Sequence, residues 1–209
     1  MAVSIKSARE IELMREAGKR LAHVHQELEA MIAPGISTWE IDAKGEKLIR
    51  DCGCIPNFLH YNGYPASICV SVNDEVVHGI PRKDRYLKEG DIVSLDAGLI
   101  YKGYHSDAAR THAVGKVSTE AQKLMDVTKQ SFFEGIKMAK EGQHLHDISR
   151  AIEEYVAPYG YGIVRDLVGH GIGTALHEDP QIPNYAQKRR GVRLQAGMTL
   201  AIDPMINAG

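Results

Sequence analysis

A ten-residue pattern that occurs twice constrains the fold of this chain more than any other feature. Both copies read L-x-x-G-x-x-aliphatic-x-aliphatic-D, first over residues 87–96 and again over residues 194–203, which lie 107 positions further along. Several glycines and helix positions recur at the same spacing and in the same order. The chain is therefore predicted to contain two copies of one helix–strand–strand unit, at about residues 8–110 and 118–209, related by a pseudo-twofold axis.

Hydrophobic periodicity and capping signals predict the order of the elements. Because helices are followed by strands, and this order occurs twice, we expect an α+β domain over residues 1–209 in which helices cover one face of a curved antiparallel sheet. The predicted helices cover residues 8–32, 37–53, 118–140 and 144–159, and the predicted strands cover residues 66–77 (with a turn at 73–74), 92–100, 104–114 and 164–168.

Two aspartates lie in a predicted β-hairpin whose turn signal is Tyr101-Lys102-Gly103. A turn centred between Tyr101 and Lys102 predicts that Asp96 and Asp107 lie directly opposite each other. Cross-strand partners have Cβ atoms about 4.5–5.5 Å apart. Two carboxylates that close repel each other unless a cation lies between them. We therefore interpret the pair as half of a metal site.

Three of the ten histidines occur in patterns that suggest a function. His170 lies in Gly169-His170-Gly171-Ile172-Gly173, where glycines would let backbone and ligands approach the imidazole closely. His78 and His177 each begin an H-x-x-P sequence, and these two sequences are 99 residues apart. We expect His78 and His177 to lie near the axis between the two repeats. The seven histidines other than these two and His170 are interpreted as surface or core residues.

Composition excludes several classes of function. The net charge of −2 gives no electrostatic reason to bind nucleic acid or an anionic membrane. No apolar run approaches the roughly 20 residues of a membrane span, and the N-terminal segment is amphipathic rather than signal-like. The three cysteines are an odd number, which favours free thiols and a location in the reducing cytoplasm.

Four segments, in the same order along the chain, resemble those of type I methionine aminopeptidases: Tyr61–Cys69, Val77–Pro81, Gly90–Asp96 and Gly169–Gly173. This resemblance implies the pita-bread fold, with its two pseudo-twofold-related halves. It also implies two divalent metal ions (Co, Mn, Fe(II) or Zn) and removal of the initiator methionine when the second residue is small. Nascent polypeptide N-termini at the ribosome are the implied partners, and a cytoplasmic monomer is the implied form.

Roles for individual residues follow from the resemblance. Asp96 is expected to bind one metal ion, Asp107 to bridge both and His170 to bind the second. Asp203 falls where the family has a metal-binding glutamate. The outer histidines, which contact the scissile amide and the oxyanion, are implied at His78 and His177. The pocket for the methionine side chain is implied to consist of Phe58, Tyr61, Tyr64 and Cys69.

The sequence departs from the family pattern in two respects. The carboxylate of Asp203 is one methylene shorter than that of a glutamate, which shortens its reach by about 1.5 Å. The matched segments end at Gly209, before the family's second metal-binding glutamate and its strand. We therefore expect this chain to lack the C-terminal strands and to have reduced activity. Two alternatives stay open: a proline-directed peptidase of the same fold, and a non-catalytic peptide-binding or interaction module.

Overall fold

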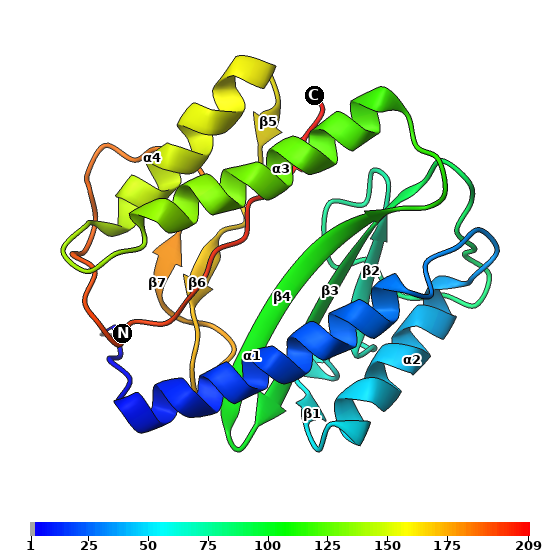
Figure 1. The fold of residues 1–209 in the computed structure, drawn as a ribbon, viewed down its shortest axis with the longest axis horizontal. Helices are drawn as coiled ribbons and strands as arrows, with labels where there is room; N and C mark the ends of the chain where they lie inside the picture. Colours follow the sequence, from blue (N-terminus) through cyan, green and yellow to red (C-terminus); the bar gives the residue numbers. More distant parts are fainter. Residues whose placement is uncertain (1–2) are drawn as a thin grey trace. The chain divides into compact units, whose positions relative to one another are not determined.

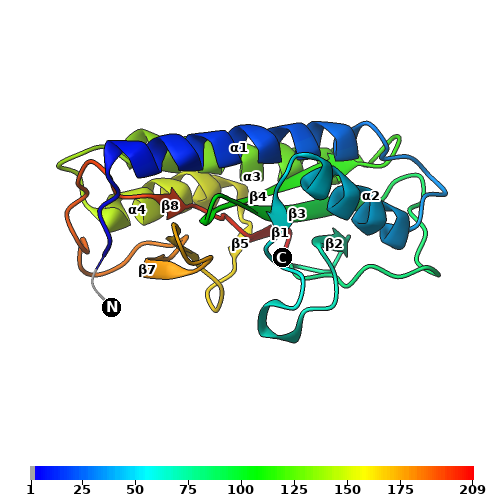
Figure 2. The same ribbon diagram turned by 90° about the horizontal axis from the view of Figure 1, so that it is seen from below.

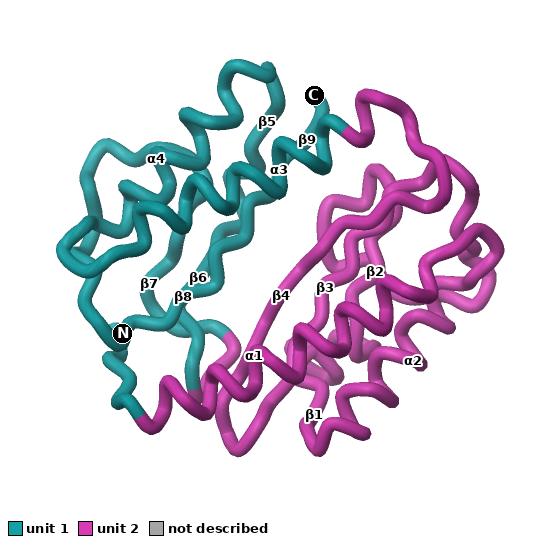
Figure 3. Tube along the Cα trace, viewed as in Figure 1, with its two compact units in different colours: residues 1–8, 123–173, 177–209 teal, residues 9–122, 174–176 magenta. Residues whose placement is uncertain are grey.

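A computed structural model describes residues 3–209. These residues divide into two compact units, coloured separately in Figure 3. Unit 1 comprises the N-terminal segment to residue 8, residues 123–173 and residues 177–209, and unit 2 comprises residues 9–122 and 174–176. The main division, at residues 122 and 123, lies close to the boundary between the two predicted repeats. None of the helices formed by residues 3–209 has the length and apolar character that a membrane crossing requires.

Unit 2 contains a four-stranded antiparallel sheet covered by two helices (Figures 1 and 2). Strand β3 is central: β1 and β2 pair with one of its edges and β4 pairs with the other. The elements are α1 (Ala8–Glu29), α2 (Thr38–Asp51), β1 (Ile55–Pro56), the 3₁₀ turn η1 (Tyr61–Gly63), β2 (Ile68–Val72), β3 (Ile92–Tyr101) and β4 (Tyr104–Ala113).

Strand alternation gives this sheet one apolar face and one polar face. On β3, the side chains of Val93, Leu95 and Leu99 are fully buried and belong to the same apolar core as the inward faces of α1 and α2. Asp96 has the opposite parity on β3, so its carboxylate projects from the face that the helices do not cover. The helices therefore stabilise the sheet from one side and leave the other side for polar groups.

Unit 1 repeats the order of two helices followed by short antiparallel strands. Its helices pack closely, since a methyl group added at Gly135 of α3 would lie 2.9 Å from the Ile152 side chain of α4. The elements are α3 (Thr119–Met138), α4 (Leu145–Val156), η2 (Ala157–Tyr159), β5 (Gly162–Ile163), β6 (Gly169–Gly171), β7 (Glu178–Ile182), β8 (Leu200–Ala201) and β9 (Ile206–Asn207). The strand orders are β7-β6-β8 and β5-β9.

The predicted repeat is present in the local structure of both units. The N–H of Gly35 donates to the carbonyl of Leu87 at 2.8 Å, and the N–H of Gly142 donates to the carbonyl of Leu194 at 2.9 Å. Both pairs are related by the 107-residue spacing. The isolated bridges Ser37–Tyr86 and His144–Arg193 show the same spacing, as do the capping boxes that open α2 and α4. The duplication therefore extends to hydrogen bonds that the sequence alone does not reveal.

Three sequence predictions were wrong in detail. The predicted strand at 164–168 is irregular, because the strands lie on either side of it as β5 and β6. The predicted strand at 66–77 forms only as β2, and the segment after the turn at 73–74 has no regular structure. The hairpin turn is Lys102-Gly103, with φ of 49° and 85°, so it is centred one residue later than predicted.

Candidate metal centre

The two hairpin aspartates share a face but are not directly opposite each other. Asp96 pairs with Ala109, and Asp107 pairs with Gly98, so the register differs from the prediction by two residues. A shift of two preserves the face, because side chains alternate with a period of two. The two carboxylates are thus diagonal neighbours, whose backbones are typically about 7–8 Å apart. This spacing leaves room for a cation between them.

The donor chemistry next to Asp96 is that of carboxylates rather than thiolates. Cys69 is the cross-strand partner of Asp96 on β2, and its side chain is buried. Burial, and then the neighbouring Asp96 carboxylate, raise the pKa of the Cys69 thiol to about 12. The thiol of the metal-free chain therefore stays protonated at neutral pH.

Tyr64 connects the predicted side-chain pocket to the segment that carries His78. Its hydroxyl donates to the carbonyls of Gly79 at 2.9 Å and Ile68 at 3.2 Å. Burial, and then a hydrogen bond with Cys69, raise the pKa of Tyr64. Among the other predicted pocket residues, Phe58 is buried and Tyr61 is exposed.

The His78 segment is bound tightly to β2. Gly79 accepts a hydrogen bond from the Val70 N–H at 2.9 Å, and its own N–H donates to the Ser71 hydroxyl at 3.0 Å. A Cβ at Gly79 would lie 2.3 Å from the Val70 carbonyl oxygen, so only glycine fits there. His78 itself has a φ of 57°, a conformation that is uncommon for residues other than glycine. Such backbone strain is found preferentially at functional sites.

In unit 1, the two ring nitrogens of His170 face different groups. Its Nδ1–H donates to the carbonyl of Gly171 at 2.8 Å. Its Nε2 lies 3.9 Å from Oδ2 of Asp203. A backbone carbonyl that holds the far nitrogen of an imidazole is the usual arrangement around metal-binding histidines. Asn184, which is fully buried, donates to the carbonyl of Asp203 at 2.6 Å and fixes its backbone.

The glycines around His170 serve protein packing. A Cβ at Gly169 would lie 2.4 Å from the carbonyl oxygen of Ala201, and a Cβ at Gly171 would lie 2.2 Å from that of Asp179. These contacts bring β7 and β8 against β6, with a register irregularity between His170 and Gly171. The sequence analysis expected close approach at these glycines, but it did not identify the segments that approach.

His177 lies beside His170, with ring centroids 4.3 Å apart and planes inclined by 53°. The predicted metal ligands thus form two pairs: Asp96 with Asp107 in unit 2, and His170 with Asp203 in unit 1. Within residues 3–209, no set of three or more His, Cys, Asp and Glu side chains is grouped closely enough to be a metal-binding cluster. Each pair by itself has the donor chemistry of a partial coordination shell.

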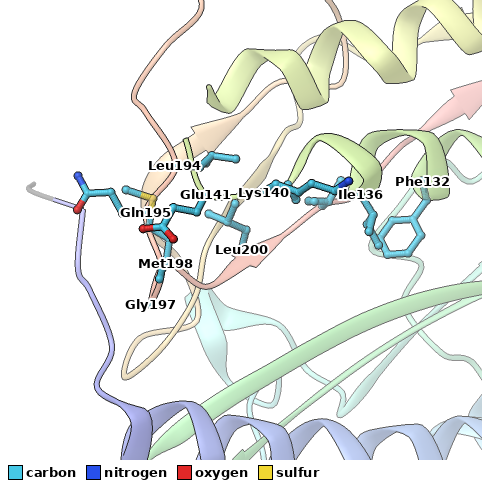
Figure 4. A pocket seen from close by; sticks show the side chains of 12 residues that line it. Phe132, Ile136, Lys140, Glu141, Leu194, Gln195, Gly197, Met198 and Leu200 are labelled. Carbon is cyan, nitrogen blue, oxygen red and sulfur yellow. The ribbon is translucent and has the colours of Figure 1, made fainter. Parts of the chain in front are cut away.

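A separate groove in unit 1, with a volume of about 490 Å³, lies between the end of α3 and the segment leading to β8 (Figure 4). Its lining is largely apolar and includes Phe132, Ile136, Met198 and Leu200. None of the predicted site residues is among the residues that line it. The groove is therefore distinct from the candidate metal ligands.

Three buried polar residues hold segments of the candidate site in place. His25 was expected to be a surface or core residue, and it is a core residue, whereas no role was predicted for Asn184 or Lys6. Asn184 and Lys6 lie in unit 1, and His25 lies on α1, where its Nε2–H donates to the carbonyl of Ala108 at 2.8 Å. His25 is a histidine on the apolar face of an amphipathic helix, between Val24 and Leu28, and this position is a signal that could have identified it. For Lys6 and Asn184 the sequence offers no comparable signal.

Comparisons with known proteins define the class to which this chain belongs. The model of metallopeptidase family M24 matches residues 12–209. The chain belongs to metallopeptidase family M24. Membership of this metallopeptidase family implies divalent metal ions.

Within that family the chain is similar to methionine aminopeptidases. It is 52% identical over 207 residues to the methionine aminopeptidase of Clostridium acetobutylicum. This match covers 99% of this chain and 83% of the relative. The crystal structure of methionine aminopeptidase from Thermotoga maritima matches with a TM-score of 0.97 and 45% identity, covering 100% of this chain and 84% of that protein. The predicted resemblance and the pita-bread fold are therefore confirmed.

A proline-directed relative is more distant. Prolidase from Pyrococcus furiosus matches with a TM-score of 0.80 and 25% identity, and the match covers 96% of this chain but only 57% of the prolidase. The comparisons thus do not favour the proline-directed alternative. They do not favour the non-catalytic module either, because relatives that share about half of the residues are named as enzymes.

Proposed function

We propose that this chain removes the N-terminal methionine from nascent proteins and peptides whose second residue is small, by metal-dependent hydrolysis. The observation that carries the proposal is the 52% identity with a methionine aminopeptidase over 99% of the chain. The family match over residues 12–209 spans all the predicted site residues. A metallo-exopeptidase of this kind needs ligands for the metal, donors for the substrate carbonyl and a pocket for the methionine side chain.

The proposed metal ligands are Asp96 and Asp107 from unit 2 and His170 and Asp203 from unit 1, and two ions are proposed. Three carboxylates and one imidazole are hard donors, which favour Mn, Fe(II) or Co and also accept Zn. When bound, such ions supply Lewis-acid chemistry that activates water and polarises a peptide carbonyl. The shared face of the two hairpin aspartates and the 3.9 Å approach of His170 Nε2 to Asp203 Oδ2 support this assignment.

The outer histidines are proposed to act on the substrate amide. His78 and His177 would donate hydrogen bonds to the scissile carbonyl as negative charge develops on its oxygen. A well-placed donor of this kind is typically worth about 3–4 kcal/mol in the transition state. The bonds that hold Gly79 to β2 and the packing of His177 beside His170 support fixed positions for both imidazoles.

The methionine side chain is proposed to bind against Phe58, Tyr61, Tyr64 and Cys69. An apolar, partly aromatic pocket suits a flexible thioether, and each sulfur–aromatic contact adds roughly 0.3–1.5 kcal/mol. Because the pKa of Cys69 is about 12, its thiol is neutral and compatible with an apolar ligand. We further propose that the chain acts as a monomer in the cytoplasm, on N-termini that emerge from the ribosome.

The test is hydrolysis of a Met-Ala-Ser tripeptide by the 209-residue chain, with Mn or Co titrated into metal-free protein. We expect metal-dependent release of methionine and no comparable cleavage of an Ala-Pro peptide. Asp96→Asn should abolish the release, whereas Asp51→Asn, which changes an exposed aspartate on α2, should not. Cleavage of Ala-Pro in preference to Met-Ala-Ser would support the proline-directed alternative. Metal binding without cleavage of either peptide would contradict the proposed activity.

A further inference from the structure

The N-terminal segment of unit 1 carries a lysine whose charge is buried beside the proposed site. The Lys6 N–H donates to the carbonyl of Gly197 at 2.8 Å, which fixes the segment along the loop before β8. The Lys6 ammonium lies 2.5 Å from Oε2 of Glu178, and the Ser4 hydroxyl donates to the same oxygen at 2.8 Å. The Lys6 ammonium also contacts the Ser4 hydroxyl.

The Lys6–Glu178 ion pair differs from the surface ion pairs of the chain in its burial. Only 6% of the Lys6 side chain and 15% of the Glu178 side chain are exposed. By contrast, the Lys19–Glu16 pair on α1 has exposures of 63% and 37%. Burying two charges has a desolvation cost that their attraction barely offsets, so apolar residues would stabilise the fold about as well. Stability alone therefore does not account for the pair.

The position of Glu178 points to a function for the pair. Glu178 directly follows His177, and in the β6–β7 ladder it pairs with Gly171, which directly follows His170. A Cβ at Gly173 would lie 2.5 Å from Cε of Lys6 and 2.6 Å from Oε1 of Glu178, so the chain after His170 is packed directly against the ion pair. The backbone that follows each of the two imidazoles is thus attached to one largely buried ion pair.

We infer that Lys6 is a positioning residue for the reaction. By holding the Glu178 carboxylate, it fixes His177 against His170, whose ring centroid is 4.3 Å away. Without Lys6, the buried carboxylate of Glu178 would lose its countercharge and move toward water, and His177 would move with it. This inference rests on the proposed function for its catalytic consequence, but the effect on the position of His177 does not depend on activity.

The kinetic test uses four forms of the full chain: wild type, Lys6→Met, Glu178→Gln and the double variant. With Met-Ala-Ser as the substrate, we expect Lys6→Met to lower kcat about ten- to a hundredfold, as a displacement of roughly 1 Å in a catalytic group does. The KM should change less than threefold, because Lys6 bonds to Ser4, Glu178 and the Gly197 carbonyl, all in unit 1, whereas the proposed substrate pocket belongs to unit 2. Lys19→Met, which removes a lysine from the exposed ion pair, should leave kcat unchanged.

The double variant separates positioning from simple stability. Removing both charges eliminates a largely buried carboxylate that no longer has the Lys6 ammonium beside it, so Lys6→Met/Glu178→Gln should melt at a higher temperature than Lys6→Met alone. If Lys6 positions His177, kcat stays low in the double variant although the fold has recovered. Recovery of kcat together with the melting temperature, or a wild-type kcat in Lys6→Met, would overturn the inference.

A spectroscopic measurement keeps the inference testable if the wild-type chain releases no methionine. In zinc-loaded protein labelled on its histidines, the ring signals of His170 and His177 should shift in Lys6→Met and stay unchanged in Lys19→Met. Unshifted ring signals would refute the positioning role regardless of activity. An inactive wild-type chain whose signals do shift would instead contradict the proposed function and leave the positioning role supported.

Discussion

Acid should destabilise unit 2 through one buried histidine, and the size of the effect follows from its surroundings. His25 on α1 is 2% exposed. Its Nε2–H donates to the carbonyl of Ala108, the residue after Asp107, and its Nδ1 is buried without a hydrogen-bond partner. Protonation would place a charge on Nδ1 inside the apolar core. Burial therefore lowers the pKa of His25 from 6.5 to about 4.

The lowered pKa of His25 sets both the sign and the pH range of the effect. The unfolded chain binds this proton below pH 6.5, whereas the folded chain resists binding it until about pH 4. Stability is therefore highest above pH 6.5 and is lost progressively as the pH falls from 6.5 to about 4. The loss contributed by His25 reaches roughly 2 kcal/mol at pH 5 and roughly 3 kcal/mol below pH 4.

Urea unfolding in the presence of a chelator, at pH 7.5 and pH 5.0, measures this contribution. His25→Gln keeps a donor for the Ala108 carbonyl but cannot take up a proton, so its stability should fall about 2 kcal/mol less than that of the wild type between the two pH values. His23→Gln changes an exposed histidine on the same helix and should behave as the wild type does. The reasoning is refuted if wild type and His25→Gln lose the same stability to within about 0.5 kcal/mol.

Two further predictions test the packing around the site. Gly171→Ala should destabilise the fold by about 1–3 kcal/mol in thermal or urea unfolding, because its Cβ would lie 2.2 Å from the Asp179 carbonyl oxygen. The matched control is Gly18→Ala, which should be neutral or stabilising because the nearest neighbour of its Cβ would be 3.9 Å away. Cys69 should not react with an aromatic disulfide reagent in the native chain at pH 8, since a pKa of about 12 leaves only about one thiolate in ten thousand molecules. The half-buried Cys52 is the internal control. Labelling of Cys69 as fast as in the denatured chain would contradict the prediction.

The hairpin illustrates how much of the site could be predicted from the sequence. Apolar residues alternate only partly along β3, but the prediction that Asp96 lies opposite Asp107 in a hairpin implied that both project from one face. The register of the hairpin could not be predicted from the sequence. Tyr101-Lys102-Gly103 allows two turn positions, and the choice depends on which residues adopt positive φ. The structure uses Lys102 and Gly103, the arrangement that matches the twist of the strands. The error was two residues, so the prediction of a shared face was still right.

Contacts between segments distant in sequence could not be predicted in the same way. The glycines of the His170 segment indicated close approach, but the approaching groups belong to β7, β8 and the N-terminal segment. The strand predicted at 164–168 failed for a related reason. Its Val164 and Val168 favour extended structure, yet the hydrogen-bonding partners available in unit 1 pair with β5 and β6 on either side. Pairing of this kind is decided by tertiary structure rather than by local preference.

The internal repeat provides a last test of the proposed metal ligands, because it places an aspartate at the same position in each copy. Asp96 and Asp203 are 107 residues apart, but their surroundings differ. Asp96 lies in the middle of β3, with paired strands on both sides. Asp203 follows the two-residue β8, and 37% of its side chain is exposed. A longer side chain therefore extends the reach of Asp203, whereas it displaces the Asp96 carboxylate from its position diagonal to Asp107.

The same substitution at these two aspartates should consequently have opposite effects. Asp203→Glu restores the reach of the glutamate that the family resemblance implies, and we expect kcat/KM for Met-Ala-Ser to rise about tenfold or more. Asp96→Glu moves a carboxylate by about the same distance away from its position diagonal to Asp107 and should lower kcat/KM about a hundredfold. Metal titration of both variants separates lost binding from lost catalysis. If Asp203→Glu binds metal as the wild type does and is no more active, Asp203 does not take the place of the family's glutamate ligand.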